Sequence, residues 1–322
     1  MEADSTTTTT TWSFLLLPSL LASSLLFFLL HRSHGARSSS NKARRLPPGP
    51  PMLLFLAKFL ALRRSIFDLG PLLRDLHARH GPIISLRLFA TTLVFVSDRR
   101  LAHRALVQGG AAFADRPPLA EPDSLFSAGG RDINSSPYGP YWRLVRRNLA
   151  AEALHRSRVA LFAPARARAC DALVADLLFL RAGDAAGVVE LRPSLRRAVL
   201  GLMVYMCFGA WIGEEALGEV EQLQRGVLMP YTSFPVFAFF PAVTKRLFRR
   251  RWAAYVALAR RQDEVFVPLI HATRGDDEPP CYAESLLALR VPDDGGEDDR
   301  PLTDAEMSSL CSEFLTPGRT RR

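Results

Sequence analysis

The sequence is poor in lysine, lacks paired cysteines and has none of the common loops that bind phosphate. Only three of its 41 basic residues are lysines. None of the four cysteines stands in a CxxC pair or beside a histidine at metal-ligand spacing, so no metal site is predicted. Because neither GxGxxG nor GxxxxGKS/T occurs, a phosphate-cradling loop is excluded. The expectation is buried free thiols in a reducing, cytosol-facing compartment, at Cys170, Cys207, Cys281 and Cys311.

The sequence also lacks the motifs of several common hydrolases, and its positive charge is unevenly spread. It contains no GxSxG and no HExxH pattern, so no catalytic nucleophile or general base is predicted. The net charge is +9, but five basic residues fall between positions 32 and 45, and three more stand among the last four. Since the remainder is close to neutral, a nucleic-acid-binding face is not expected.

An uncharged apolar stretch near the N-terminus predicts a membrane anchor. It runs over nineteen residues, from Trp12 to Leu30, close to the roughly 20 that a spanning helix needs. Acidic residues precede this stretch and the basic cluster follows it, so the bulk of the chain is expected on the cytosolic side. The basic cluster is expected to touch anionic membrane lipid.

A proline-rich segment, LPPGPP from Leu46 to Pro51, follows the basic cluster and predicts a stiff hinge. The sequence thus divides into four expected parts. These are a lumenal tip with the transmembrane signal anchor (1–30), the basic flank with the hinge (31–51), a globular part (52–315) and an aberrant tail (316–322).

The globular part is expected to be mainly α with a small β-sheet, an α+β fold. The stretch IISLRLFATTLVFVSD alternates apolar and polar residues around a turn, which predicts a hairpin and one small sheet near the start. The acidic, glycine-containing run VPDDGGEDDR predicts a solvated loop. Helical patterns occur near 138–150, 157–181, 194–208, 213–228, 242–272 and 281–290.

The final predicted helix has a well-specified start and an abrupt end. Thr303 can cap it, and Glu306 stands three residues later, where it can return a bond to the cap. Pro317 and Gly318 stop the helix, because proline removes a backbone donor and glycine favours helix ends. The residues between form one apolar stripe, made of Met307, Leu310, Cys311, Phe314 and Leu315.

The most informative stretch for chemistry is YGPYWRLVRRN, residues 138–148. Trp142 and Arg146 are four positions apart, so both lie on one helical face. An indole N–H and a guanidinium together suit a carboxylate or a phosphate. The alternative is a packed indole with an arginine laid over it, which is common in proteins. The irregular stretch 111–136 just before this helix is unusually long for a compact domain, which is typical of functional loops.

Taken in order, these features resemble a cytochrome P450 of the plant microsomal type, most closely the plant family numbered eighty-nine. The resemblance is carried by a colinear series that covers 46–315, a little over the first half of a complete family member. After the anchor it comprises LPPGPP, HGPIISLRL, VFVSDRRLAHRALVQGGAAFADRPP, NSSPYGPYWRLVRRNLAAEALHRSR, LMVYMCFG and LCSEFL.

The resemblance implies the N-terminal part of the P450 catalytic domain, and it implies roles for particular residues. In the family the W-x-x-x-R helix contacts the haem propionates, which assigns Trp142 and Arg146 to the cofactor. The long loop corresponds to a substrate-lining segment, and the implied pocket residues are Leu119, Leu125, Phe126 and Ile133.

The resemblance also implies an activity and a location. Family members are haem-thiolate monooxygenases, which oxidise a small organic substrate with O₂ and electrons from NADPH–cytochrome P450 reductase. A single-pass protein of the endoplasmic reticulum membrane is therefore expected, with most of the chain in the cytosol. Neither the substrate nor the position of its oxidation is implied.

The end of the chain departs from the family pattern. After LCSEFL the family continues into an oxygen-handling helix and later a glycine-rich loop with the haem-ligating cysteine, whereas this chain ends TPGRTRR. No axial cysteine, and hence no metal ligand, is expected, so the chain as given is predicted to be a truncated, inactive monooxygenase. The alternatives are a non-catalytic membrane-anchored fragment and, on net charge alone, a basic membrane protein that binds anionic lipid or nucleic acid.

Overall fold

The structure of the protein is a computed structural model. It describes residues 46–51, 55, 69–88, 91–183, 188–232, 236–273, 275, 278–293 and 298–316. Its contacts divide the chain into Met1–Pro48 and Gly49–Arg322, and the second unit holds every helix and strand that the structure describes. The predicted anchor and nearly all of its basic flank lie outside the described residues, as does the tail beyond residue 316. Among the helices that the structure describes, none is long and apolar enough to cross a membrane.

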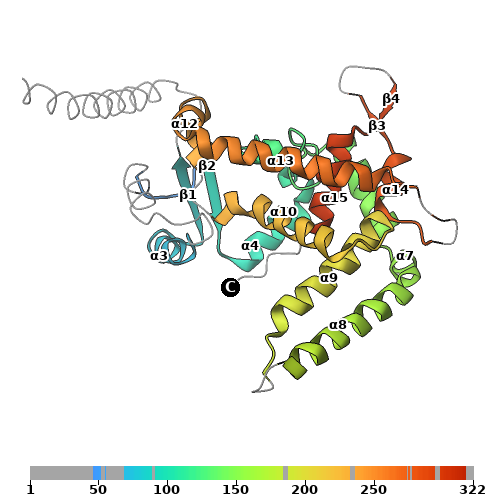
Figure 1. The fold of residues 1–322 in the computed structure, drawn as a ribbon. Coiled ribbons are helices and arrows are strands. Elements are labelled where there is room, and N and C mark those ends of the chain that lie inside the picture. The colour runs from blue at the N-terminus through green and yellow to red at the C-terminus, as the bar shows by residue number, and fades with distance from the viewer. Residues whose placement is uncertain are drawn as a thin grey trace, which may run out of the picture. The chain divides into compact units, whose positions relative to one another are not determined.

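The first part of this unit is a helix followed by the predicted hairpin (Figure 1). Helix α3 (Gly70–His80) ends at Gly81, whose φ of 96° lies in the left-handed region that favours glycine. Strands β1 (Ile83–Leu88) and β2 (Thr91–Val96) then pair antiparallel. Their apolar side chains pack with α3 and leave Ile84 and Leu86 fully buried, which confirms the hairpin and its inward face.

Gly49 of the proline-rich segment lies directly against this hairpin. A Cβ atom built on Gly49 would fall 1.8 Å from the backbone carbonyl oxygen of Ser85 in β1, closer than any side chain can approach. The glycine is therefore required by a close backbone contact.

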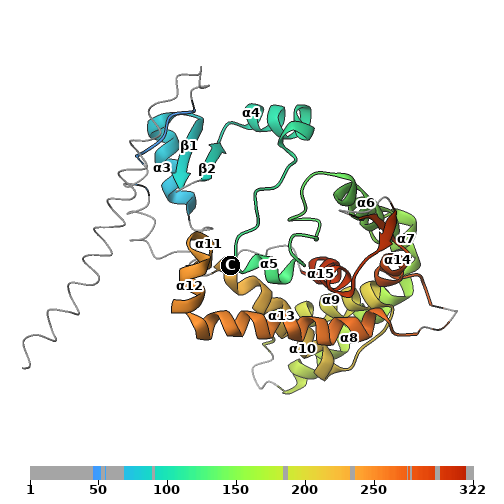
Figure 2. The same cartoon turned by 90° about the horizontal axis from the view of Figure 1, so that it is seen from above.

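Helices make up most of the remaining chain (Figures 1 and 2), so the prediction of a mainly helical α+β fold is confirmed. The long antiparallel neighbours α8 and α9 are joined near residue 188, and α10 and α13 pack against each other further along. Their bounds are α4 (Arg99–His103), α5 (Asp123–Phe126), α6 (Pro140–Asn148), α7 (Arg156–Leu161), α8 (Ala163–Gly183), α9 (Leu191–Phe208), α10 (Glu214–Thr232), α11 (Val236–Phe239), α12 (Pro241–Leu247), α13 (Arg249–Ile270), α14 (Tyr282–Leu287) and α15 (Asp304–Leu315).

Two helices continue into π-helical turns. α4 runs on into Arg104–Gln108, and α6 runs on into Leu149–Ala153. The widened turns are marked by bonds between residues five apart, as where the N–H of Leu154 donates to the carbonyl of Leu149 at 3.1 Å. A short 3₁₀ turn, Gly110–Phe113, follows the first of them.

A second small sheet corrects the prediction of only one. Strands β3 (Arg290–Pro292) and β4 (Asp299–Pro301) pair antiparallel and enclose most of the acidic run that was expected to be a loop. Each strand has three residues, too short to show an alternating pattern in the sequence. Val291 is nevertheless fully buried, so the hairpin is anchored in the main core. This is the buried apolar cluster that includes Val204 of α9, Phe266 of α13 and Leu310 of α15.

Helix α15 confirms its predicted start and apolar stripe. The side chain of Thr303 accepts the N–H of Glu306, and Glu306 returns a bond to the N–H of Thr303. α15 packs against α9, α13 and α14, and four of the five stripe residues are buried, with Phe314 half-buried. Buried polar side chains add to this packing, since Ser312 bonds with Gln262 of α13 at 3.0 Å and with Gln224 of α10 at 3.3 Å.

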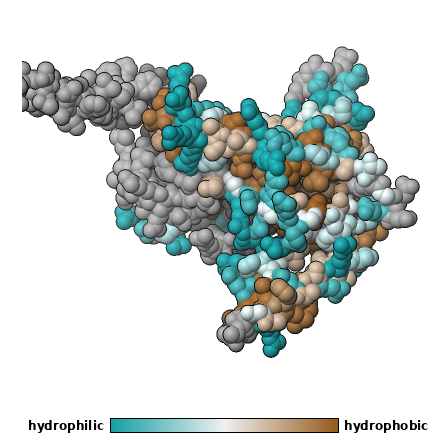
Figure 3. All heavy atoms as spheres, viewed as in Figure 1, coloured by the Kyte–Doolittle hydropathy of each residue, from teal (hydrophilic) through white to brown (hydrophobic). Residues whose placement is uncertain are grey.

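Helix α8 differs from α15, because several large apolar side chains on it face solvent. Phe179 is 78% exposed, and Val174 and Leu178 are exposed as well. Figure 3 shows hydrophobic surface around the joined ends of α8 and α9. The prediction of four buried thiols is wrong at one position for the same reason, since Cys170 lies on the open side of α8 while the other three cysteines are buried.

Candidate cofactor-binding site

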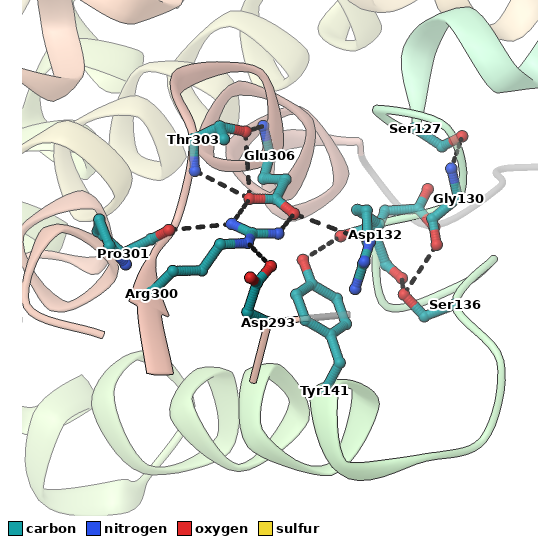
Figure 4. Close-up of polar contacts among 11 residues, drawn as sticks. Ser127, Gly130, Asp132, Ser136, Tyr141, Asp293, Arg300, Pro301, Thr303 and Glu306 are labelled. Atoms are coloured by element: carbon teal, nitrogen blue, oxygen red, sulfur yellow. Dashed lines mark hydrogen bonds and ion pairs between the residues drawn. The ribbon is translucent and has the colours of Figure 1, made fainter. Parts of the chain in front are cut away.

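The predicted cofactor helix, α6, packs beside a loop that folds largely on itself. This loop, residues 127–136, connects α5 to α6. The hydroxyl of Ser136 is buried and contacts the carbonyl oxygens of Gly130 and Asp132, at 3.0 and 2.6 Å (Figure 4). The N–H of Gly130 donates to the hydroxyl of Ser127 at 3.1 Å. Short polar side chains therefore give the loop one defined shape without regular secondary structure.

The backbone of Ile133 joins this loop to both neighbouring helices. Its N–H donates to a carboxylate oxygen of Glu313 in α15 at 2.8 Å. Its carbonyl accepts the indole N–H of Trp142 in α6 at 2.9 Å. The side chain of Ile133 is buried in the main core, so one residue of the loop is held on three sides.

A second set of bonds fixes the same loop through Glu306, at the start of α15 (Figure 4). Arg300 of β4 makes a two-pronged contact with the Glu306 carboxylate, at 2.7 and 2.8 Å. Arg131 of the loop approaches the same carboxylate at 3.8 Å. Burial by itself raises the pKa of Glu306, but the bonds from Arg300 and Thr303 outweigh it and lower that pKa below its usual range.

Tyr141 connects α6 to this charged group. Its hydroxyl donates to the carbonyl of Arg131 at 2.7 Å, and the Arg131 guanidinium lies over its ring at 4.7 Å from the centroid. Burial, followed by the nearby charge of Glu306, raises the pKa of Tyr141. The phenol is therefore neutral near neutral pH, where it acts as a hydrogen-bond donor.

Trp142 and Arg146, the predicted donor pair, differ in what is left free on each. Trp142 is half-buried, packs on Tyr138 at 5.4 Å between ring centroids and has its N–H engaged by Ile133. Arg146 is exposed, and within the part of the chain that the structure describes its guanidinium has no hydrogen-bond or ion-pair partner. The alternative of an arginine stacked on the indole is not what is seen, since the stacked arginine in this helix is Arg143, over Tyr138.

Glu313 is a functional candidate that the sequence reasoning missed. Burial and the neighbouring Asp132 raise its pKa to about 7, while the backbone bond from Ile133 and the charge of Arg146 oppose the rise. The available signal was a carboxylate next to the apolar stripe of a helix that the sequence marked as core-forming. An acid at such a position is unusual, because buried carboxylates are costly unless they are bonded.

The four predicted pocket residues fall into separate environments. Leu125 and Phe126 join Phe237 of α11 and Tyr255 of α13 in one apolar cluster, in which Phe126 meets Tyr255 edge to face at 6.4 Å. Ile133 belongs to the main core instead. Leu119 is half-buried and lies outside the buried clusters of the described residues. The structure thus brings two of the four together.

Comparison with protein families identifies the architecture around α6 and α15. The family model for Cytochrome P450 matches residues 47–319. The chain belongs to the cytochrome P450 family. The family implies a haem cofactor, and its members are monooxygenases.

Individual P450 relatives agree in sequence and in fold. The chain is 39% identical over 275 residues to "Cytochrome P450 89A9" of Arabidopsis thaliana, over 83% of this chain and 53% of that one. It is 29% identical over 263 residues to "Cytochrome P450 CYP99A1" of Sorghum bicolor. A zebra fish cytochrome P450 solved with abiraterone has a TM-score of 0.57 and 20% identity, over 76% of this chain and 53% of that one. The chain thus spans about half the length of the relatives it matches.

The described part of α6 presents a cationic side chain of the kind that would suit the edge of a haem. A free guanidinium on Arg146 suits a haem propionate, because Arg pairs with carboxylates in two-pronged bonds. None of the four cysteines stands ready for the iron, since Cys207, Cys281 and Cys311 are packed into the apolar core and Cys170 lies on the open side of α8.

Proposed function

We propose that this chain is the propionate-binding and substrate-lining portion of a P450 monooxygenase. The observation that carries the proposal is the exposed guanidinium of Arg146 on α6, which has no hydrogen-bond or ion-pair partner among the described residues, in a chain whose family uses haem. When bound with its thiolate ligand, haem supplies O₂ activation and the insertion of one oxygen atom into an organic substrate. The residues of this chain bind and orient the cofactor edge and enclose part of the substrate.

Arg146 is proposed to hold one propionate, and Trp142 to close the same edge. A charged donor is worth more here than a neutral one, because bonds between guanidinium and carboxylate are roughly twice as strong as neutral ones. The cluster of Leu125 and Phe126 with Phe237 and Tyr255 is proposed as one apolar wall of the substrate site. This wall supports an apolar small organic molecule as the substrate class.

The proposed setting is the endoplasmic reticulum membrane, with a single spanning segment and most of the chain in the cytosol. Support comes from the nineteen uncharged residues at 12–30 and from the basic residues that follow, which suit anionic lipid. NADPH–cytochrome P450 reductase is proposed as the electron donor, because family members of this type receive electrons from a membrane-bound reductase.

The test of the propionate assignment is the affinity of the chain for hemin. Hemin is titrated into the detergent-solubilised chain, and binding is followed by quenching of tryptophan fluorescence. We expect Arg146→Leu to weaken binding about tenfold, the equivalent of one charge-assisted bond of about 1.4 kcal/mol. Arg147→Leu removes an equal charge from an adjacent exposed position and is expected to change binding less than twofold. Equal losses in the two variants would show that only net charge matters and would reject the assignment.

A second measurement addresses the iron. Because three cysteines are buried in the core and Cys170 is remote from α6 in sequence and lies on α8, we expect the reduced, hemin-loaded chain to show no thiolate-type carbon-monoxide difference band. A clear band of that type would mean that one of the four cysteines reaches the iron, and it would overturn the placement of the cysteines relative to the cofactor.

A further inference from the structure

We propose that Glu313 is a positioning residue for the haem site, which orients the Trp142 indole by holding the backbone of Ile133 between them. The inference rests on the proposed function for its relevance to haem, and on the geometry of three residues for its content. It adds a residue outside the W-x-x-x-R helix to the set that determines the shape of the propionate edge.

Two hydrogen bonds connect Glu313 to Trp142 through the backbone of Ile133. The carboxylate of Glu313 accepts the N–H of Ile133 at 2.8 Å, and the carbonyl of the same residue accepts the N–H of Trp142 at 2.9 Å. Both distances are those of well-formed hydrogen bonds. A shift of Ile133 therefore changes the acceptor position that the indole must follow.

Glu313 and Trp142 differ in how firmly each side chain is held. Glu313 projects from α15, a helix that is fixed by a capping box and by burial of most of its residues. Among the described residues, the ring of Trp142 contacts the ring of Tyr138, which offers no acceptor to the indole N–H, since that N–H is bonded to Ile133. The orientation of the indole is thus imposed from α15 through Ile133, and not the reverse.

Ionisable groups from three other segments surround Glu313. The groups that act on it are Asp132 from the loop, Arg146 from α6 and Tyr282 from α14. Tyr282 is buried and neutral, Asp132 disfavours the charged carboxylate, and Arg146 favours it. The pKa of Glu313 is raised to about 7, so the carboxylate changes charge near neutral pH, and a charged acceptor binds an N–H more strongly than a neutral one.

The arrangement differs from simple anchoring of a loop in one measurable way. If Glu313 only anchors the loop, its charge has no effect on the indole of Trp142. If Glu313 positions Trp142, the indole N–H reports the protonation of a carboxylate that it does not touch. The closing experiment therefore follows the indole.

The experiment uses the full chain in detergent, without haem, labelled with ¹⁵N on tryptophan. The sequence has four tryptophans, and Trp142→Phe identifies the relevant resonance. Its chemical shift and its solvent exchange rate are recorded from pH 6 to pH 8. We expect a shift with a midpoint near pH 7 and, relative to free indole at the same pH, weaker protection from exchange below the midpoint, because the neutral carboxyl holds Ile133 less firmly.

Two variants of Glu313 and one control separate the possibilities. Glu313→Gln keeps an acceptor and removes the charge, so the midpoint should vanish and the protection of the indole should stay at the weaker level that the wild type shows below its midpoint. Glu313→Ala removes the acceptor, and exchange of the Trp142 N–H should accelerate at least tenfold. Glu264→Gln changes an exposed carboxylate on α13 and should reproduce the wild-type titration, and the Trp211 resonance should stay constant in all variants.

The proposal is overturned if the midpoint persists in Glu313→Gln, or if exchange in Glu313→Ala matches the wild type. Its failure is separable from that of the proposed function, which is tested by hemin affinity in Arg146→Leu. An indole that follows Glu313 in a chain whose hemin affinity ignores Arg146 would leave the coupling intact and remove its connection to haem.

Discussion

The two ends of the segment before α6 are held in place by different physical means. Around Phe126 the contacts are apolar and aromatic, with Phe237 and Tyr255 as neighbours. Around Ile133 they are hydrogen bonds and charges that lead to Glu306 and Glu313 on α15. The first end depends on the area that it buries, which is insensitive to pH, whereas the second depends on the protonation of carboxylates. The segment before α6 thus combines an apolar wall with a pH-dependent attachment to α15.

The largest effect is expected at the apolar end. Phe126→Ala removes a buried ring and leaves a cavity, so the free energy of unfolding should fall by about 3 to 5 kcal/mol. Urea denaturation of the detergent-solubilised chain at pH 7 measures the loss. Phe179→Ala, at an exposed position of α8, is the matched control and should change stability by less than about 0.5 kcal/mol. Equal losses would mean that the Phe126 cluster is not part of the folded core.

At the polar end, breaking the buried charged contact is the next most damaging change. Glu306→Leu removes the two-pronged contact with Arg300, while Asp293 stays 3.6 Å from the Arg300 guanidinium, and the expected loss is about 2 kcal/mol. Glu152→Leu breaks a more exposed contact, with Arg158, and should cost less than about 1 kcal/mol. Since the pKa of Glu306 is lowered by folding, its stabilisation is present above its ordinary pKa and disappears as the pH falls through the folded value. The difference between the two variants should therefore shrink in acid.

The pH dependence of Glu313 has the opposite sign and a smaller size. Folding raises its pKa, so the native state binds a proton that the unfolded state has lost, and stability declines as the pH rises toward and through 7. Between pH 6 and pH 8 the expected decline from this group is about 1 kcal/mol. Comparison of denaturation curves for wild type and Glu313→Gln isolates it. A slope that is unchanged in the variant would assign the pH dependence to another group.

The smallest expected effect lies in the loop itself. Ser136→Ala removes a buried hydroxyl that contacts two carbonyl oxygens, at a cost of about 1 kcal/mol. Amide exchange of residues 130–136 should accelerate while exchange in the β1–β2 hairpin stays constant. Uniform acceleration across the chain would instead indicate global destabilisation.

Local features were predictable from the sequence because they depend on neighbours in the chain. Thr303 and Glu306 are three residues apart, and the resulting capping box is present. The four-residue spacing of Trp142 and Arg146 likewise puts both on α6. Every one of these predictions uses contacts within one helical turn.

The remaining features depend on contacts that local spacing does not encode. The bonds of Ile133 with Glu313 cross 180 positions of the chain, and Glu306 gains its charged partners only once β4 and the loop are assembled. The β3–β4 hairpin was missed because its strands are short and acidic residues surround them. Cys170 was assigned to the core because cysteine is usually buried, although its helix keeps that side open.

The π-helical turn after α6 has a consequence for insertions and deletions. Leu149–Ala153 holds one residue more than an α-helical turn, and each residue of an α-helix turns the chain by about 100°. Deleting one residue there would restore α-helical geometry and leave the residues downstream in nearly the same orientation relative to the Trp142 face, because the widened turn accommodates its extra residue within about one turn. Adding a residue between Trp142 and Arg146 would instead move Arg146 off the Trp142 face. A change of one residue is therefore tolerable within Leu149–Ala153 and harmful in the preceding turn, between Trp142 and Arg146.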